Sequence, residues 1–304
     1  MQYDIIVVGA GPAGLTAAIY ARRANRSVLL IEKQAFGGQM TLSPNVENYP
    51  GFVHISGNEL ADHMLSQALE QGAQVDLAQV TSLTSQPQGW HVTTDTGCYD
   101  AAAVILALGV KHRTPGLPNE EKFFGKGISF CAVCDGAFYR GKDVAVLGGG
   151  NSALQEAILL SENCSHVTIL QDLPNLTADL ALQKALAAHN NISVRCGVRL
   201  TGLSGDTALC GITIVENGQP QTIACTGLFV AIGLIPANEA FASVAALDPQ
   251  GYFAASSDCL GSAPGIFVAG DCRAKKIRQI ATAVGDGAVA AQAACAYLNR
   301  INEE

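Results

Sequence analysis

The chain opens with the run YDIIVVGAGPAGL, residues Tyr3–Leu15, and this run decides the fold. A strand-like apolar segment is followed by glycines spaced G-x-G-x-x-G, and a helical stretch continues to Arg23. A second apolar strand, Val28–Ile31, then ends at Glu32, which is placed to accept hydrogen bonds from an adenosine ribose; an ordinary solvated acid is the alternative. Strand, glycine loop, helix and acid-terminated strand together predict a dinucleotide-binding, Rossmann-like unit.

Each glycine of this loop has a predicted task. Gly9 allows the tight turn, Gly11 lets the backbone approach a pyrophosphate, and Gly14 lets the helix pack on its strand. The pyrophosphate then meets free N–H groups and the positive end of the helix dipole. The predicted contacts of the loop are Gly9, Gly11, Pro12, Ala13 and Gly14.

A second glycine loop, Gly148–Ala153, lies in the same kind of context. A strand over 143–147 precedes it, and a helix to about Asn163 and a strand over 166–170 follow it. The sequence therefore predicts an α/β protein with two Rossmann-like dinucleotide-binding domains, the second inserted into the first. Linker-like stretches at 113–121 and 234–238 place the domains at 1–114, 115–240 and 241–304, the first and last forming one unit. The last helix is predicted from about Gly285 to Asn299.

Between the two loops lies a C-x-x-C pair, Cys131 and Cys134. Two cysteines at this spacing can close and reopen a small disulfide, and so store two electrons. A flavin or nicotinamide also moves electrons in pairs. Half of a zinc site is the alternative, but the six histidines form no H-x(3–5)-H pair and there is no second C-x-x-C. No metal site is predicted, and electron exchange between a bound cofactor and a disulfide is favoured.

Composition restricts the class of partner. The 304 residues carry a formal net charge of −8, which argues against a general nucleic-acid or anionic-membrane surface. No run of about 18 uncharged apolar residues suggests a membrane span, and a fold that begins at residue 3 leaves no room for a targeting peptide. The eight other cysteines are scattered as small hydrophobes would be, which favours a reducing, cytoplasmic compartment. Cys259 and Cys272 could pair, but buried free thiols are the favoured expectation.

The order and spacing of the motifs resemble the low-molecular-weight thioredoxin reductases over essentially the whole chain. The matching stretches are Gly9–Gly14, Gly37–Gln39, Val46–Gly51, Cys131–Gly136, Gly148–Ala153, Gly270–Asp271 and Arg278–Gln279. This resemblance implies FAD in the first unit, an NAD(P)H-type fold in the second, a thioredoxin-like protein substrate, and a homodimer. It also implies a domain rotation about the two linkers.

The resemblance also implies roles for single residues. Cys134 would lie against the flavin, Cys131 would attack the substrate disulfide, and Asp135 would give and take protons; an ordinary turn acid is the alternative for Asp135. Further cofactor contacts implied are Glu32, at the adenosine ribose, and the adjacent Lys33. The resemblance also places Gly38, Gln39 and Asn48 beside the flavin, and Gly270 and Asp271 at the ribityl–phosphate region. The backbone of Arg278, Gln279 and Ile280 would face the flavin ring.

The chain departs from the family where NADPH would bind. NADPH-using relatives end the second strand of the inserted unit in His-Arg-Arg, with a further Arg four residues on. Here these positions hold Gln171, Asp172, Leu173 and Thr177. Each lost charge-assisted hydrogen bond costs about 1.5–3 kcal/mol, so NADPH is not expected as the donor.

Several donors and functions stay open. Ferredoxin or another one-electron carrier is slightly favoured; NADH, as in the flavoprotein of the alkyl hydroperoxide reductase system, is the close alternative. Against NADH, Gln155 replaces a Glu that helps to position the nicotinamide. A small-molecule dithiol oxidase and a non-catalytic flavin-bound sensor are further alternatives. The retention of both cysteines and Asp135 argues against the sensor.

Overall fold

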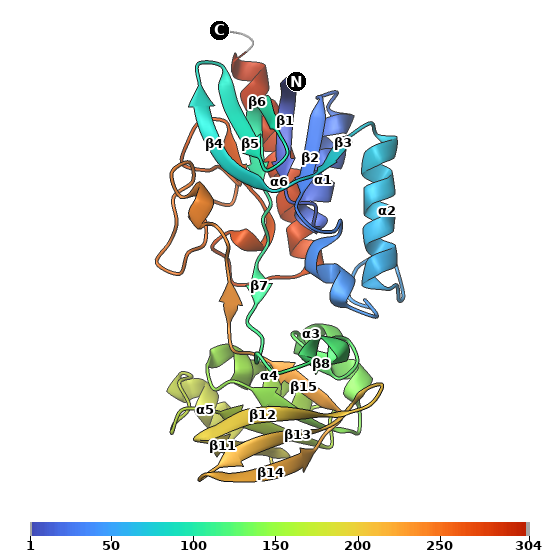
Figure 1. Ribbon diagram of the computed structural model, residues 1–304, viewed down its shortest axis with the longest axis vertical. Coiled ribbons are helices and arrows are strands. Elements are labelled where there is room, and N and C mark those ends of the chain that lie inside the picture. The colour runs from blue at the N-terminus through green and yellow to red at the C-terminus, as the bar shows by residue number, and fades with distance from the viewer. Residues whose placement is uncertain (1, 302–304) are drawn as a thin grey trace. The chain divides into compact units, whose positions relative to one another are not determined.

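The computed structural model describes residues 2–301 and divides into two compact units. Unit 1 comprises the described residues up to Lys111 and from Pro236 on, and unit 2 is His112–Ile235 (Figure 1). The boundaries lie three residues (111 against 114) and five residues (235 against 240) before the expected ones. The reason is that the two crossing segments pair with each other, as β7 (Lys111–His112) and β16 (Leu234–Ile235), before the prolines of the linkers are reached.

Unit 1 is built on a seven-stranded sheet in the order β3-β2-β1-β6-β5-β4, with β17 also paired to β6. β1, β2, β3, β6 and β17 are joined by parallel pairs, and β4, β5 and β6 by antiparallel ones. The strands are β1 (Gln2–Val8), β2 (Val28–Glu32), β3 (Gln74–Leu77), β4 (Val80–Gln86), β5 (Gly89–Thr94), β6 (Cys98–Leu106) and β17 (Ile266–Val268). The helices are α1 (Pro12–Arg23), α2 (Gly57–Glu70), α6 (Ile280–Ile301) and the 3-10 turns η1 (Gly38–Leu42), η4 (Glu239–Phe241) and η5 (Gly270–Cys272).

The two faces of this sheet bury different cores. Ile5 and Val7 of β1 pack with α1, α2 and α6, whereas Ile6 and Val8 pack with β4, β5 and the segment around Phe253. Side chains alternate across a strand, so a strand that is apolar throughout is buried on both sides. The apolar run Ile5–Val8 is therefore the central strand of the sheet.

Unit 2 repeats the arrangement on a smaller scale. A five-stranded parallel sheet has the order β11-β10-β9-β15-β8, and a separate antiparallel sheet has the order β12-β13-β14. Val144 and Val146 of β9 face the helices, and Ala145 faces the second sheet. The strands are β8 (Ile128–Ser129), β9 (Asp143–Leu147), β10 (His166–Gln171), β11 (Ile192–Cys196), β12 (Val198–Gly205), β13 (Leu209–Glu216), β14 (Gln219–Ala224) and β15 (Gly227–Val230). The helices are α3 (Ala132–Asp135), α4 (Asn151–Ser161), α5 (Leu180–Leu186) and the 3-10 turns η2 (Glu120–Phe123) and η3 (Gly136–Tyr139).

The predicted fold class is confirmed, with one element misjudged: α6 begins at Ile280, five residues before the expected Gly285. Cys259 and Cys272 are separate buried thiols, as favoured.

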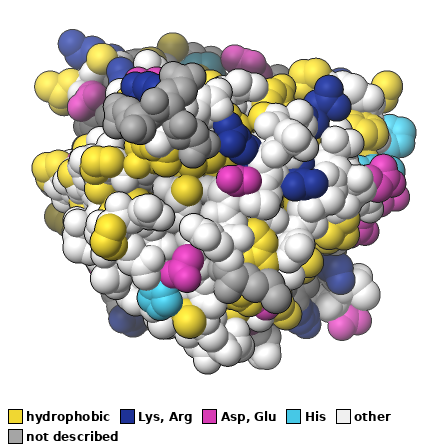
Figure 2. All heavy atoms as spheres, turned by 90° about the horizontal axis from the view of Figure 1, so that it is seen from above, with side chains coloured by type: hydrophobic (Ala, Val, Ile, Leu, Met, Phe, Trp, Pro, Cys, Tyr) yellow, Lys and Arg dark blue, Asp and Glu magenta, His cyan; other side chains and the backbone are white. Residues whose placement is uncertain are grey.

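Among the described residues, no helix is both long and apolar enough to cross a membrane. Figure 2 shows a face on which acidic, basic and apolar side chains are interspersed.

Candidate functional site: a redox disulfide and two glycine-loop cradles

The first cradle is the loop between β1 and α1 in unit 1. A Cβ atom added at Gly14 would lie 1.8 Å from the carbonyl oxygen of Gly9, so no larger residue lets α1 start so close to the strand. Gly9 itself has φ +100°, a backbone region that favours glycine. At Gly11, by contrast, an added Cβ would have its nearest neighbour 4.0 Å away, so the backbone is open to an approaching group. The predicted tasks of the three glycines fit this geometry.

Glu32 closes one side of this cradle. Its Oε2 accepts a hydrogen bond of 2.8 Å from the N–H of Ala10, and its Oε1 accepts one of 3.0 Å from the N–H of Gln34. The carboxylate is therefore held at the glycine loop. Lys33, the next residue, is exposed.

Asp271 lies in η5, which packs on the first turn of α1. A Cβ at Gly270 would meet the Ala13 side chain at 2.8 Å, and Gly270 has φ +79°. Burial raises the pKa of Asp271, although Lys275 and Arg278 oppose this shift. Its Oδ1 is buried without a hydrogen-bond partner among residues 2–301; the Lys275 ammonium lies 3.5 Å away. A buried carboxylate oxygen whose charged neighbour is as far as 3.5 Å can also accept from a ligand that carries hydroxyl groups.

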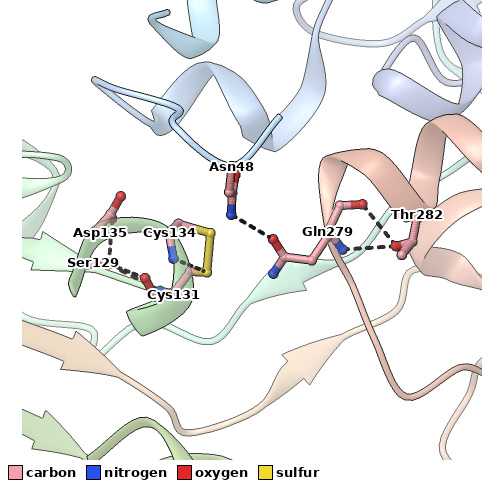
Figure 3. Close-up of a disulfide and its surroundings, with 7 residues drawn as sticks. All are labelled: Asn48, Ser129, Cys131, Cys134, Asp135, Gln279 and Thr282. Atoms are coloured by element: carbon pink, nitrogen blue, oxygen red, sulfur yellow. Dashed lines mark hydrogen bonds between the residues drawn. A yellow bond between two sulfur atoms is a disulfide. The ribbon is translucent and has the colours of Figure 1, made fainter. Parts of the chain in front are cut away.

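Two further segments of unit 1 meet near this cradle. The Asn48 amide donates to Oε1 of Gln279 at 3.2 Å (Figure 3). Arg278 stacks over Tyr252 at 4.2 Å and donates to the carbonyl oxygens of Asp271 and Arg273. Its guanidinium thus fixes the segment that leads into Ile280 and α6. Gly38 and Gln39 are exposed at the start of η1.

The redox centre lies in unit 2, at the start of the short helix α3. Cys131 and Cys134 form a disulfide with their Cα atoms 5.3 Å apart (Figure 3). Cys131 caps this helix, and its Sγ accepts a hydrogen bond of 3.2 Å from the N–H of Cys134. An N–H directed at this sulfur can stabilise a thiolate there once the disulfide is opened.

Asp135 follows directly; the residue is partly buried, and its Oδ1 atom is fully buried. Burial raises the pKa of its carboxyl group, while a hydrogen bond from Ser129 lowers it. Ser129 is 3% exposed, and its hydroxyl donates to Oδ2 of Asp135 at 2.6 Å. Nothing in the sequence pattern singled out Ser129, because β8 brings it to the disulfide from outside the C-x-x-C motif.

An aromatic stack supports this segment. The His112 ring lies 4.7 Å from that of Phe130, the residue before Cys131, and Phe124 packs edge-on against Phe130. Burial lowers the pKa of His112 to about 4, so the ring is neutral at physiological pH. The stack is thus an apolar support and adds no charge beside the cysteines.

The second cradle is a cavity of about 640 Å³ around Gly148–Gly150 in unit 2. Gln171 is buried, and a Cβ on Gly149 would lie 2.5 Å from its amide nitrogen, so the side chain lies across the loop. Asp172, Leu173 and Thr177 also line the cavity. So do Arg113 and Arg199, two cationic side chains that the sequence motifs did not reveal.

The helix after this loop carries two residues of interest. Gln155 is exposed. Glu156 is mostly buried, its Oε2 has no hydrogen-bond partner among the described residues, and burial raises its pKa to about 8. The expected flavin contacts thus all lie in unit 1, whereas the disulfide, Asp135 and the second glycine loop lie in unit 2.

Comparison with known proteins gives matches along the whole chain. The family described as pyridine nucleotide-disulphide oxidoreductase matches residues 3–287. A thioredoxin reductase of Treponema pallidum is 41% identical over 303 residues, which are 99% of this chain and 98% of the relative. A Clostridium pasteurianum relative, described as a 34.2 kDa protein in rubredoxin operon, is 38% identical over 98% of this chain and 97% of its own.

Solved structures agree with these relatives. The crystal structure of thioredoxin reductase from Streptococcus pyogenes is 38% identical and has a TM-score of 0.94. The match covers 98% of this chain and 99% of that chain. Fold and sequence therefore point to the same family.

Proposed function

Because this chain belongs to the thioredoxin reductases of the pyridine nucleotide-disulphide oxidoreductase family, we propose that it passes electrons through FAD and the Cys131–Cys134 disulfide to a thioredoxin-type protein disulfide, without NADPH as donor. The observation that carries the proposal is the disulfide at the start of α3, with the partly buried Asp135 next to it. A structural disulfide would need no such acid. The retained acid also argues against a non-catalytic sensor.

FAD suits the first cradle. Gly9, Gly11 and Gly14 would receive its pyrophosphate, and Glu32 would accept from the adenosine ribose. The buried Oδ1 of Asp271 supports this assignment, since the Lys275 ammonium is 3.5 Å away and the ribityl chain would offer closer hydroxyl donors. Bound FAD would supply electrons in pairs to the disulfide. Mass spectrometry of the cofactor released from purified protein tests this assignment: FAD supports it, and FMN or no flavin contradicts it.

The cysteines and Asp135 would complete the exchange. In the dithiol form, Cys131 passes its proton to Asp135, and the thiolate attacks one sulfur of the partner disulfide. An S–S bond forms to Cys131, the partner bond breaks, and the leaving thiolate takes the proton from Asp135. Cys134 then gives its proton to Asp135 and attacks Cys131 Sγ, which re-forms the internal disulfide. The second partner thiolate takes that proton, so two electrons and two protons have moved to the partner.

The second cradle supports a donor other than NADPH. Gln171, Asp172, Leu173 and Thr177 offer no cation where a 2′-phosphate would need one, and Asp172 adds a negative charge. Arg113 and Arg199 also line the cavity, but neither stands at one of these four positions. One relative is named for its place in a rubredoxin operon, and rubredoxin is a one-electron carrier. Ferredoxin or a similar carrier is therefore the proposed donor.

NADH is the second candidate, because the cavity remains open. A space of about 640 Å³ lined by the glycine loop can admit an adenosine, and the Gln171 amide can hydrogen-bond to a free ribose diol. Anaerobic titration with NADPH, NADH and reduced ferredoxin, following the loss of flavin absorbance, tests the donor. Reduction by ferredoxin alone supports the proposal, reduction by NADH supports the second candidate, and rapid reduction by micromolar NADPH contradicts both. Hydrogen peroxide formed with small dithiols as the only reductant would indicate the oxidase instead.

A further inference from the structure

Ser129 joins the two halves of the redox segment through one hydroxyl group. Its oxygen accepts a hydrogen bond of 3.1 Å from the N–H of Cys131 and donates one of 2.6 Å to Oδ2 of Asp135 (Figure 3). The residue is 3% exposed on β8, so water does not compete for either bond. A hydroxyl has a single hydrogen, and an ionised carboxylate can only accept. The carbonyl oxygen of Cys131 is a second acceptor for this hydrogen, but it lies 3.5 Å from the hydroxyl oxygen, so the shorter bond of 2.6 Å to Oδ2 is favoured.

The two oxygens of Asp135 are consequently unequal. Oδ2 is occupied by Ser129 in both protonation states, since it can accept from the hydroxyl as a carboxylate oxygen or as a carbonyl oxygen. Oδ1 is buried and has no hydrogen-bond partner within residues 2–301. A buried, unpaired oxygen destabilises the charged form and binds a proton readily.

We propose that Ser129 is a positioning residue, which holds Asp135 by Oδ2 and reserves Oδ1 for the proton that is exchanged with the cysteines. This deepens the proposed function, and it rests on the proton transfer by Asp135 proposed there. The same hydroxyl fixes the backbone of Cys131, so the nucleophile and its proton acceptor share one support. Losing the hydroxyl removes a bond that stabilises the carboxylate, and burial then raises the pKa of Asp135 further.

Other titratable groups near the acid do not blur this effect. Helix α3 packs against α4 and η3, whose titratable residues are Glu156 and Tyr139. Burial raises their pKa values to about 8 and about 12, so at neutral pH Tyr139 is uncharged and Glu156 is mainly protonated. β8 carries none besides the serine hydroxyl itself. The hydroxyl of Ser129 is thus the polar group whose removal is expected to move the titration of Asp135.

The test compares Ser129→Val with Ser129→Thr, which have nearly the same shape and differ in the hydroxyl. Ser129→Ala is a third variant, and Ser161→Ala removes another hydrogen-bonded hydroxyl of unit 2 as a control. The titration of Asp135 is followed by NMR of protein labelled with carboxyl-¹³C aspartate, with its signal identified by its loss in Asp135→Asn. This measurement needs neither a donor nor a partner protein.

We expect the midpoint of Asp135 to move to higher pH in the Val and Ala variants and to stay at the parent value in the Thr and Ser161 variants. The acidic limb of thioredoxin disulfide reduction should move in the same direction, with a rate loss of about tenfold at pH 7, against about 100-fold or more for Asp135→Asn. An unchanged midpoint in Ser129→Val would overturn the inference. A shifted midpoint without any thioredoxin reduction by the parent protein would instead contradict the proposed function.

Discussion

At the scale of single residues, the two cysteines are not equivalent. The Sγ atom of Cys131 accepts a hydrogen bond from the N–H of Cys134, and the N–H of Cys131 donates one to the hydroxyl of Ser129. We expect Cys134→Ser to keep its flavin but to lose electron transfer to the thiols, and Cys131→Ser to leave a Cys134 thiolate that gives a charge-transfer band with oxidised flavin. Absorbance spectra and single-turnover reduction of a thioredoxin measure both effects. Either variant working at the parent rate would show that these roles are wrongly assigned.

Glu156 makes stability depend on pH. Burial raises its pKa from 4.5 to about 8, whereas in the unfolded chain it returns to an ordinary value. Between these values the unfolded chain has released a proton that the folded protein keeps, so the free energy of unfolding falls as the pH rises. We expect Glu156→Gln to abolish this loss, which is on the order of 3 kcal/mol between pH 5 and 8. Urea denaturation at both pH values measures it, with the exposed Glu162→Gln as control; parallel curves for parent and Glu156→Gln would contradict the expectation.

At the scale of elements, the sequence predicted the strands around both glycine loops well, because short apolar runs bounded by glycine leave few alternatives. It misplaced the start of α6, since Gly285 and Gly287 resemble a helix boundary. The structure gives the physical reason: a Cβ at Gly287 would lie 2.2 Å from the carbonyl oxygen of Ala13, so this glycine lets α6 cross α1 closely. A contact between segments so distant in the chain leaves no local signature.

The same pair of glycines gives a matched test. Gly287→Ala should force α6 away from α1 and destabilise unit 1 by about 1–3 kcal/mol, with weaker flavin retention. Gly285→Ala adds a methyl group with nothing within 4 Å, and it should stabilise the helix by about 0.5–1 kcal/mol. Urea denaturation followed by circular dichroism and flavin fluorescence distinguishes the two. Equal effects of both substitutions would show that the close crossing is not what requires Gly287.

At the scale of the whole molecule, both units contain a strand, a glycine loop, a helix and a second strand. The residue that ends the second strand differs in its chemistry between the two units. Glu32 and Gln171 both end the second strand after a glycine loop, but Glu32 accepts from the loop N–H, whereas the neutral Gln171 lies across Gly149. The loops and the C-x-x-C could be found from sequence because each is a local pattern. Arg113 and Arg199 could not, because segments outside the glycine loop bring them to the cavity. Ser129 could not either: it lies only two residues before Cys131, but its bond to Asp135 depends on how β8 and α3 are folded together.

The side chains around the second glycine loop determine whether NADPH can bind as the electron donor. Introducing arginines there tests this. A 2′-phosphate carries close to two negative charges at neutral pH, which Arg113 and Arg199 would have to offset beside the carboxylate of Asp172. We expect Asp172→Arg, Leu173→Arg and Thr177→Arg together to tighten NADPH binding by at least about tenfold, since each new charge-assisted hydrogen bond contributes about 1.5–3 kcal/mol. Binding of NADH, which has no 2′-phosphate, should not tighten. Asp172→Asn is the control, because it removes the repulsion of the 2′-phosphate without adding a positive charge. Gln155→Glu, added to the triple variant, tests whether this residue positions the nicotinamide ring. Fluorescence titration measures binding, and stopped-flow absorbance measures flavin reduction. If the triple variant binds NADPH no better than the parent, charge is not what excludes NADPH, and the Gln171 side chain closes the cavity to dinucleotides.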